Sequence, residues 1–153
     1  MSMYIFDTNI FIRLKSYYRS RFLTIWERLD ALSGGELYSV REVYNEIKDD
    51  KSFVTDWVQA HRSIFRDPTQ KEFEFVRTIF ENRHFQGLIR PGQINQGSRV
   101  ADPFVIAAAE VYAGTVVTEE RFVPNGARIP NICKHYKIPC INMEEFLAAE
   151  DLP

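Results

Sequence analysis

The chain has 153 residues, of which 45% are hydrophobic and 14% aromatic, enough to fill the core of one compact domain. No apolar run reaches the roughly 18 residues that cross a bilayer, and the first residues lack the basic segment and cleavage site of a secretory signal. The net charge of -2 gives no overall signal for nucleic-acid binding. Two cysteines are too few for a disulfide scaffold, so we expect one cytoplasmic domain, residues 1–153, with reduced thiols and no membrane partner.

The first predicted element is a buried strand in the segment YIFDTNIFI, with Asp7 at or just past its end. Helical and strand patterns then alternate along the chain. In order, they predict a helix over 22–32, a strand over 37–40, helices over 39–50, 53–65 and 68–85, a polar loop over 92–100, a helix over 101–114, a strand over 115–120, a short helix over 132–136, a strand over 138–142 and a closing helix over 143–152.

Capping patterns mark the starts of several of these helices. Asp67 and Asp102 are each followed by proline, which is typical of an N-cap and the first helical position. Two pairs have the spacing of a capping box, in which a small polar residue is followed three positions later by glutamate: Ser39 with Glu42, and Asn142 with Glu145.

Alternating strands and helices indicate the α/β class, a three-layer α/β/α sandwich around a central, mostly parallel sheet. In such folds ligands bind beyond the carboxyl ends of the strands, where the strand order reverses. Asp7 and the pair Glu119–Glu120 both fall at predicted carboxyl ends. This edge of the sheet is therefore the first place to expect a site.

Asp7 is the strongest candidate for a functional acid. A buried carboxylate is unfavourable unless it is paired, hydrogen-bonded or bound to a metal, so Asp7 needs a partner from elsewhere in the chain. An N-cap for the following helix would also explain an aspartate in this place. A cap needs only one acceptor, however, and does not explain why other acids fall at the same edge.

Each of the other acidic positions has a structural and a functional interpretation. Glu46 lies in the helix REVYNEI, where a solvated glutamate is the ordinary alternative to a site residue. Asp102 is expected to cap its helix, and its second carboxylate oxygen can still face a site. Glu119 and Glu120 point in different directions because they are neighbours, so only one is expected to enter a site. Thr118 could hold a carboxylate or a water there.

Together these are four carboxylates, near residues 7, 46, 102 and 120, on separate elements of one predicted sheet. Like charges in a cleft resist ionising together unless a cation neutralises them. Oxygen ligands suit Mg²⁺ or Mn²⁺, and the three histidines have no zinc spacing. Such a site activates water against a phosphodiester. Beside it, a basic cluster that is otherwise an ordinary solvated face becomes relevant: Arg13, Lys15, Arg19 and Arg21.

In these motifs the sequence resembles the PIN-domain family. Within that family it is most similar to the PIN-like proteins related to VapC-type toxins of toxin–antitoxin modules. The matching segments are YIFDTNIFI, SVREVYNEI, ADPFVIAAAEVYA and VVTEERF, in the family's order over nearly the whole chain. The resemblance implies a PIN-like fold and a Mg²⁺- or Mn²⁺-dependent endoribonuclease that leaves a 5′-phosphate and a 3′-hydroxyl. It also implies an RNA substrate, an antitoxin protein as partner and pairing into a homodimer.

Carried over position by position, the resemblance assigns Asp7, Glu46 and Asp102 as the principal acids that hold one or two metals. The fourth family motif usually reads Thr-x-Asp and maps onto Thr118 and Glu120, with glutamate in place of aspartate. The longer side chain leaves open whether the fourth acid ligates directly, works through water or yields to its neighbour Glu119.

Two further residues follow from the same resemblance. Asn9 matches the polar residue that orients the first acid or a water. Arg13, one turn later, is a candidate contact to the RNA backbone, with a salt-sensitive contribution to affinity.

Other functions explain the sequence less completely. A phosphotransferase with an aspartate nucleophile also begins with a strand ending in Asp, but it normally carries a second carboxylate two residues later, where this chain has Asn9. A receiver-like signalling domain is disfavoured because its acids lie close to the N-terminus. The main alternative is a PIN-like RNA- or protein-binding module with weak catalysis. All four acidic positions remain acidic here, which favours the nuclease.

Overall fold

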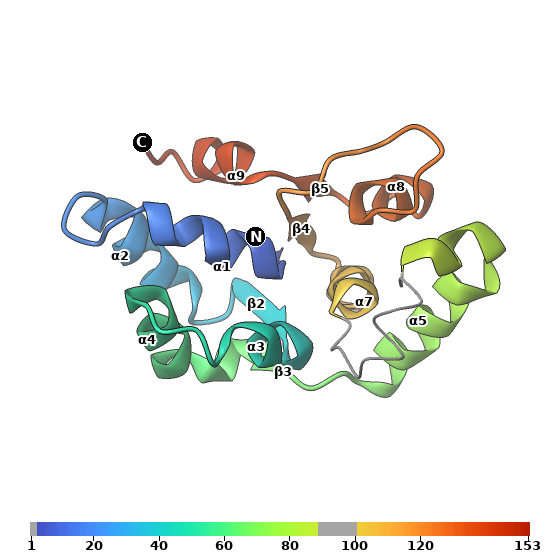
Figure 1. Ribbon diagram of the computed structural model, residues 1–153, viewed down its shortest axis with the longest axis horizontal. Helices are drawn as coiled ribbons and strands as arrows, with labels where there is room; N and C mark the ends of the chain where they lie inside the picture. Colours follow the sequence, from blue (N-terminus) through green and yellow to red (C-terminus); the bar gives the residue numbers. More distant parts are fainter. Residues whose placement is uncertain (1–2, 89–100) are drawn as a thin grey trace.

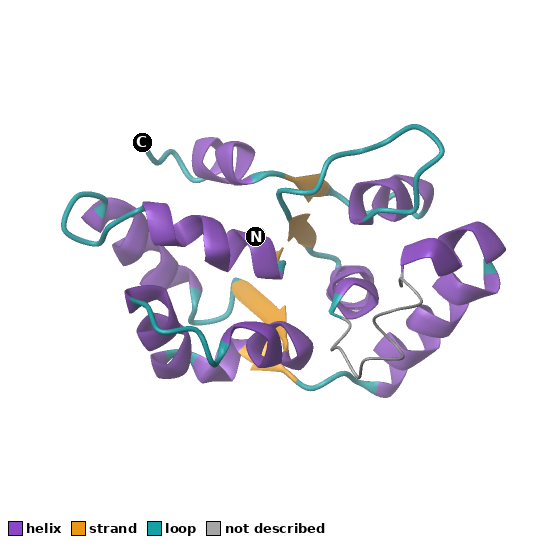
Figure 2. Ribbon diagram, in the orientation of Figure 1, coloured by secondary structure: helices purple, strands orange, loops and turns teal. Residues whose placement is uncertain are grey.

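The computed structural model describes residues 3–88 and 101–153, in which five strands form one parallel sheet (Figure 2). The strand order is β3-β2-β1-β4-β5. This order reverses between β1 and β4, so their carboxyl ends form the topological switch point of the sheet. The strands are β1 (Tyr4–Phe6), β2 (Leu37–Val40), β3 (Phe65–Arg66), β4 (Thr115–Val117) and β5 (Cys140–Ile141).

Helices cover the sheet on two sides, which confirms the predicted three-layer α/β/α sandwich around a parallel sheet. In Figure 1, α1, α2 and α4 lie on one side of the strands, and α5, α7 and α8 lie on the other. The α-helices are α1 (Thr8–Arg13), α2 (Leu23–Leu32), α3 (Arg41–Ile47), α4 (Phe53–Ala60), α5 (Gln70–Glu81), α7 (Asp102–Tyr112), α8 (Ile129–His135) and α9 (Met143–Ala149). Short 3₁₀ helices come after α1, α4 and α5. They are η1 (Leu14–Ser16), η2 (Arg62–Ile64) and η3 (Arg83–Leu88).

All three residues of the central strand β1 are buried. Because successive strand residues point in opposite directions, both faces of the strand are covered. Tyr4 and Phe6 pack edge-on against Phe146 of α9, with ring centroids 4.8 and 5.1 Å apart. On the other face Ile5 lies against the turn that joins α7 to β4. A Cβ atom at Gly114 in this turn would come within 3.1 Å of the backbone oxygen of Met3, so glycine allows the close approach of β4 to β1.

Most predicted elements are present, but several helix starts differ from the prediction, among them that of α8, which begins at Ile129 and not at 132. Asp67 does not cap α5; Thr69 does, through a capping box in which its side chain binds the backbone of Glu72 and Glu72 binds back. Asp67 instead lies on the surface, 3.5 Å from Arg41. Pro68 stands in the segment before the cap rather than at the first helical position, because the helix begins only at Gln70.

Ser39 also has a different role from the predicted capping box with Glu42. It is still part of β2, and its buried hydroxyl donates a hydrogen bond of 2.7 Å to the backbone oxygen of Phe6. The helix begins after Val40, without a side-chain cap, and Glu42 pairs with Arg41. The predicted box at Asn142 and the start of α9 is confirmed.

The helix predicted over 53–65 ends at Ala60, and Phe65–Arg66 form the short edge strand β3 beside β2. Two residues carry too little periodicity to reveal a strand, so its pairing with Ser39 and Val40 decides it. The predicted polar loop over 92–100 lies outside the described residues. Of the helices that are described, none has the length and apolar character to cross a lipid bilayer.

The capping box at the start of α5 gives a direct test of this local structure. We expect Thr69→Ala to lower the free energy of unfolding by about 0.5–2 kcal/mol, because it removes the acceptor for the backbone N–H of Glu72. Asp67→Ala, the control, should change it by less than about 0.5 kcal/mol, since the residue is surface-exposed. Urea unfolding of both variants measures this, and a larger effect of Asp67→Ala would contradict the assignment.

Candidate active site

Asp7 directly follows β1 and is buried, with 3% of its surface exposed. Its Oδ1 atom accepts a hydrogen bond of 2.8 Å from the backbone N–H of Thr8, so it caps α1. Its Oδ2 atom accepts a second bond of 2.8 Å from the hydroxyl of Thr118, which follows β4. Asp7 is therefore both a helix cap and a link between the two strands at the switch point.

The Thr118 hydroxyl organises the turn after β4. Its single proton goes to Asp7, and its oxygen accepts from Asn9 Nδ2 at 3.2 Å and from the backbone N–H of Glu120 at 3.1 Å. Asn9 also accepts from the backbone N–H of Glu119 through Oδ1, at 3.0 Å. The hydroxyl thus uses its full hydrogen-bonding capacity to fix the turn against Asp7.

Thr8 joins Asp7 to the second acidic motif. While its backbone N–H binds Asp7, its hydroxyl donates a hydrogen bond to Glu46 Oε2. Glu46 comes from α3, and its side chain is exposed at the surface beside α1. The first two acids of the resemblance are therefore bridged by one threonine.

Asp102 and Glu120 border one small hollow of about 430 Å³, together with Arg128. The prediction that Asp102 caps α7 is wrong: it is the first residue of the helix, Ala101 stands at the cap, and no side chain binds there. The half-buried Glu120 places its Oε2 atom in the protein interior. The side chain of Glu119 is engaged elsewhere. Its Oε1 atom accepts a hydrogen bond of 3.1 Å from the backbone N–H of Met143, at the start of α9.

The four predicted acids thus lie around one edge of the sheet, linked in two ways. Hydrogen bonds through Thr8 and Thr118 connect Asp7 with Glu46 and with the backbone of Glu120, and a shared hollow connects Glu120 with Asp102. Within residues 3–88 and 101–153, no three acidic, histidine or cysteine side chains form a ready cluster for a metal ion. Direct ligation by three acids would require their side chains to turn toward one another.

The electrostatics of this edge are set by burial. Burial raises the pKa of Asp7 above its usual range, and the hydrogen bonds from Thr118 and Thr8 lower it in part. Two thiols close by, Cys133 of α8 and Cys140 of β5, are hydrogen-bonded to each other. That bond raises the pKa of Cys133 and lowers that of Cys140, because one thiol remains the donor when the other ionises.

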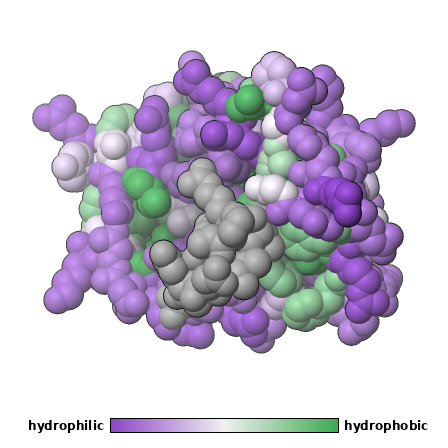
Figure 3. Space-filling model, turned by 45° about the vertical axis from the view of Figure 1, so that its right-hand side comes forward, coloured by the Kyte–Doolittle hydropathy of each residue, from purple (hydrophilic) through white to green (hydrophobic). Residues whose placement is uncertain are grey.

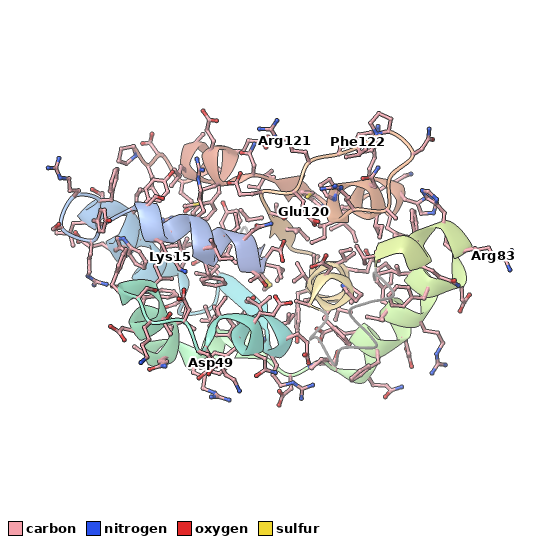
Figure 4. All side chains as sticks on the ribbon, viewed as in Figure 1. Lys15, Asp49, Arg83, Glu120, Arg121 and Phe122 are labelled. Atoms are coloured by element: carbon pink, nitrogen blue, oxygen red, sulfur yellow. The ribbon has the colours of Figure 1, made fainter. Side chains whose placement is uncertain are left out.

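A larger hollow, of about 970 Å³, is also lined by Glu120. We call it the large hollow. Figure 4 shows Glu120 near β4, with Arg121 and Phe122 on the segment that follows. Residues from α1, the segment after β4 and α9 line this hollow, among them Arg13, Tyr17, Thr118, Glu119, Glu120, Arg121, Phe122 and Glu144.

A protein-family model described as "Domain of unknown function (DUF4411)" matches residues 4–152. The chain belongs to this family. No curated protein matches it in sequence. Among solved structures, it is similar to a chain in the crystal structure of VapBC2 from Rickettsia felis bound to a DNA fragment from their promoter. The TM-score is 0.53, with 92% of this chain and 98% of that chain covered, and the identity of 16% makes this a likeness of fold alone.

Several residues of this DUF4411 site had no individual role in the sequence prediction. Thr8 was inconspicuous beside Asp7, and the paired thiols looked like ordinary buried cysteines. Arg121 and Phe122 are the last two residues of the fourth matching segment, VVTEERF, so their position was the one available signal. Their shared hollow with Arg13 depends on contacts between segments more than 100 residues apart, which a local pattern does not contain.

The raised pKa of Asp7 predicts how this DUF4411 chain responds to pH. With divalent cations removed, the carboxyl group stabilises the fold below its unfolded pKa, near 3.8, and this contribution is lost as pH rises through the higher folded pKa. The melting temperature of Asp7→Asn minus that of the wild type should therefore become more positive as pH rises from 4 toward neutrality. Thermal melts in EDTA measure this. Asp49→Asn, which removes an exposed carboxylate, is the control, and a constant difference for Asp7→Asn would contradict the expectation.

Proposed function

We propose that this protein is a metal-dependent endoribonuclease that cleaves RNA phosphodiesters, and that it is the toxin component of a toxin–antitoxin system. The observation that carries the proposal is the buried carboxylate of Asp7 at the switch point of the sheet, hydrogen-bonded into a network that reaches Glu46 and the backbone of Glu120. Ligands of open α/β sheets bind at this place. The PIN-domain resemblance of the four motifs agrees with it.

The donor set fits a hard divalent cation. Asp7, Glu46, Asp102 and Glu120 supply only carboxylate oxygens, the ligands preferred by Mg²⁺ and Mn²⁺. Among the described residues, no lysine, arginine or histidine forms an ion pair with Asp7, and its two hydrogen-bond donors, the Thr8 backbone N–H and the Thr118 hydroxyl, are both neutral. A bound cation would offset the buried charge. When bound, it would polarise the scissile phosphate and lower the pKa of a water molecule.

The protein's own groups then have distinct roles in the proposed site. Thr8 and Thr118 hold the two oxygens of Asp7 in fixed directions, and Asn9 orients Thr118. Glu120 is the fourth acid of the proposal, because Glu119 is engaged at the start of α9. Arg13 borders the large hollow and would contact the RNA backbone.

The proposed biological setting rests on the fold and the resemblance together. The chain has the fold of a VapBC2 chain from a complex bound to promoter DNA, and its motifs resemble VapC-type toxins. An antitoxin protein that covers the acidic edge, a homodimer and a cytoplasmic location complete the proposal. The second candidate is a catalytically weak RNA- or protein-binding module, favoured by the lack of a ready three-ligand cluster among the described residues.

Cleavage of RNA is the decisive experiment. The pure protein is incubated with a pool of structured and single-stranded RNA in Mg²⁺, Mn²⁺ or EDTA, and the cut ends are mapped. We expect metal-dependent cleavage that Asp7→Asn reduces by more than about 100-fold, since loss of even an outer partner of a metal ligand typically reduces activity about 10- to 100-fold. Asp49→Asn should cleave like the wild type. Cutting that persists in EDTA or in Asp7→Asn would contradict the proposed chemistry.

Metal binding can be measured without activity. Mn²⁺ at about 100 times its dissociation constant should stabilise the protein by about 2.7 kcal/mol, which raises the melting temperature by roughly 5–10 °C. Asp7→Asn should blunt this rise and Asp49→Asn should keep it. Equal shifts in all three proteins would place the metal elsewhere and favour the binding module.

A further inference from the structure

Phe122 stands out among the exposed aromatic side chains because of what surrounds it. Its surface is 49% exposed, the same fraction as that of Phe73 on α5. Phe73 has an aromatic partner, since its ring meets Phe104 edge-on with centroids 5.5 Å apart. In the described part of the chain, no aromatic ring packs on Phe122; its described ring contact is the ammonium of Lys134, 4.8 Å from the centroid.

The face in Figure 3 is mostly hydrophilic, with hydrophobic patches between hydrophilic side chains. Single exposed hydrophobic residues are common on protein surfaces, so an exposed phenylalanine is not by itself a signal. Its position is informative. Phe122 borders the large hollow, and Glu120, two residues earlier, lies between this hollow and the small one that holds Asp102. The ring therefore borders the same hollow as Glu120, the proposed fourth acid.

Cationic and aromatic side chains alternate around the large hollow. Arg121 and Phe122 line it from the segment after β4, and Arg13 and Tyr17 line it from the end of α1 and the residue after η1. Among the described residues neither arginine pairs with a carboxylate, although others do, such as Arg28 with Glu150. Both guanidinium groups are thus available to an anionic ligand.

These features match the way proteins bind single-stranded nucleic acid. Such sites combine cationic groups along the phosphate backbone with aromatic rings on which unpaired bases stack. Four glutamates also line the hollow, Glu119 and Glu120 after β4 and Glu144 and Glu145 on α9, so phosphates would contact the arginines of α1 and of the segment after β4 and not these carboxylates. A duplex keeps its bases stacked inside and offers none to an exposed ring.

We infer that the large hollow is the binding subsite for a single-stranded segment of the RNA substrate, with a base stacked on Phe122 and phosphates on Arg121 and Arg13. The inference rests on the proposed function and adds to it the side chains that hold the substrate. It assigns to Phe122 a positioning role, in which the stacked base directs the neighbouring phosphodiester toward Glu120 and Asp7. Lys134, beside the ring, adds a positive charge for the phosphate of the stacked nucleotide.

Binding without cleavage tests this inference. Labelled single-stranded RNA of mixed sequence is titrated in EDTA with the Asp7→Asn protein and with the same protein carrying a second substitution. Phe122→Ala and Phe122→Leu should weaken binding by about 5- to 100-fold, as expected for the loss of one stacked base, and Phe122→Tyr should retain it. Phe73→Ala, at an equally exposed phenylalanine, should bind like the parent.

Charge is tested in parallel. Arg121→Gln should weaken binding and reduce its salt dependence, whereas Arg83→Gln, a matched change far from Glu120 in Figure 4, should do neither. Duplex RNA should bind less tightly than single-stranded RNA, because its bases are already stacked, and single-stranded DNA of the same sequence should bind no more tightly than the RNA. Melting temperatures of all variants establish that they are folded.

The outcomes separate the inference from the proposed function. Metal-dependent RNA cleavage by the wild type, with binding that Phe122→Ala leaves unchanged, overturns the subsite and leaves the nuclease standing. Equal affinity for duplex and single strand also overturns it, because stacking requires an unpaired base. Preference for DNA overturns the RNA assignment. If the protein neither binds nor cleaves RNA, both the subsite and the proposed function are overturned.

Discussion

The structure at the functional edge depends on one hydrogen-bonded carboxylate, that of Asp7. A buried charge of this kind is unfavourable unless each oxygen is satisfied, and here each oxygen accepts from a different part of the chain. One donor is the backbone at the start of α1, and the other is a hydroxyl more than 100 residues later, after β4. The interaction therefore fixes the helix, the two central strands and the acidic edge relative to one another.

The parallel sheet explains why this edge can gather residues from distant segments. With the order β3-β2-β1-β4-β5, β1 and β4 lie side by side at the switch point, and the chain leaves them in opposite directions along the sheet. Side chains after both strands consequently share one cleft-forming edge. Helix α3 adds Glu46 beside α1, and the start of α7 adds Asp102 beside Glu120.

The same edge combines tight packing with adjustable surface groups. Asp7 and Thr118 are buried and fully engaged, whereas Glu46, Arg13 and Phe122 are exposed. The thiols of Cys133 and Cys140 add polarisable groups near Asp7. The buried carboxylate thus has its position set by two hydrogen bonds, while the charged and aromatic side chains around it are exposed to a ligand.

The sequence by itself determined the α/β class, most helices and strands, and the placement of Asp7 and Glu120 near strand ends, because these follow from local periodicity and strand-end chemistry. It did not determine the cap of every helix: Asn142 caps α9 as predicted, but Ser39 bonds to the neighbouring strand and Thr69 replaces Asp67, since competing partners arise only in the folded chain. The short strand β3 needed its pairing with β2. Only the tertiary structure showed that Glu119 binds the start of α9 whereas Glu120 borders both hollows. It also brought Arg13 to the same hollow as Phe122. Both results depend on contacts between distant segments, which the winding of the sheet decides.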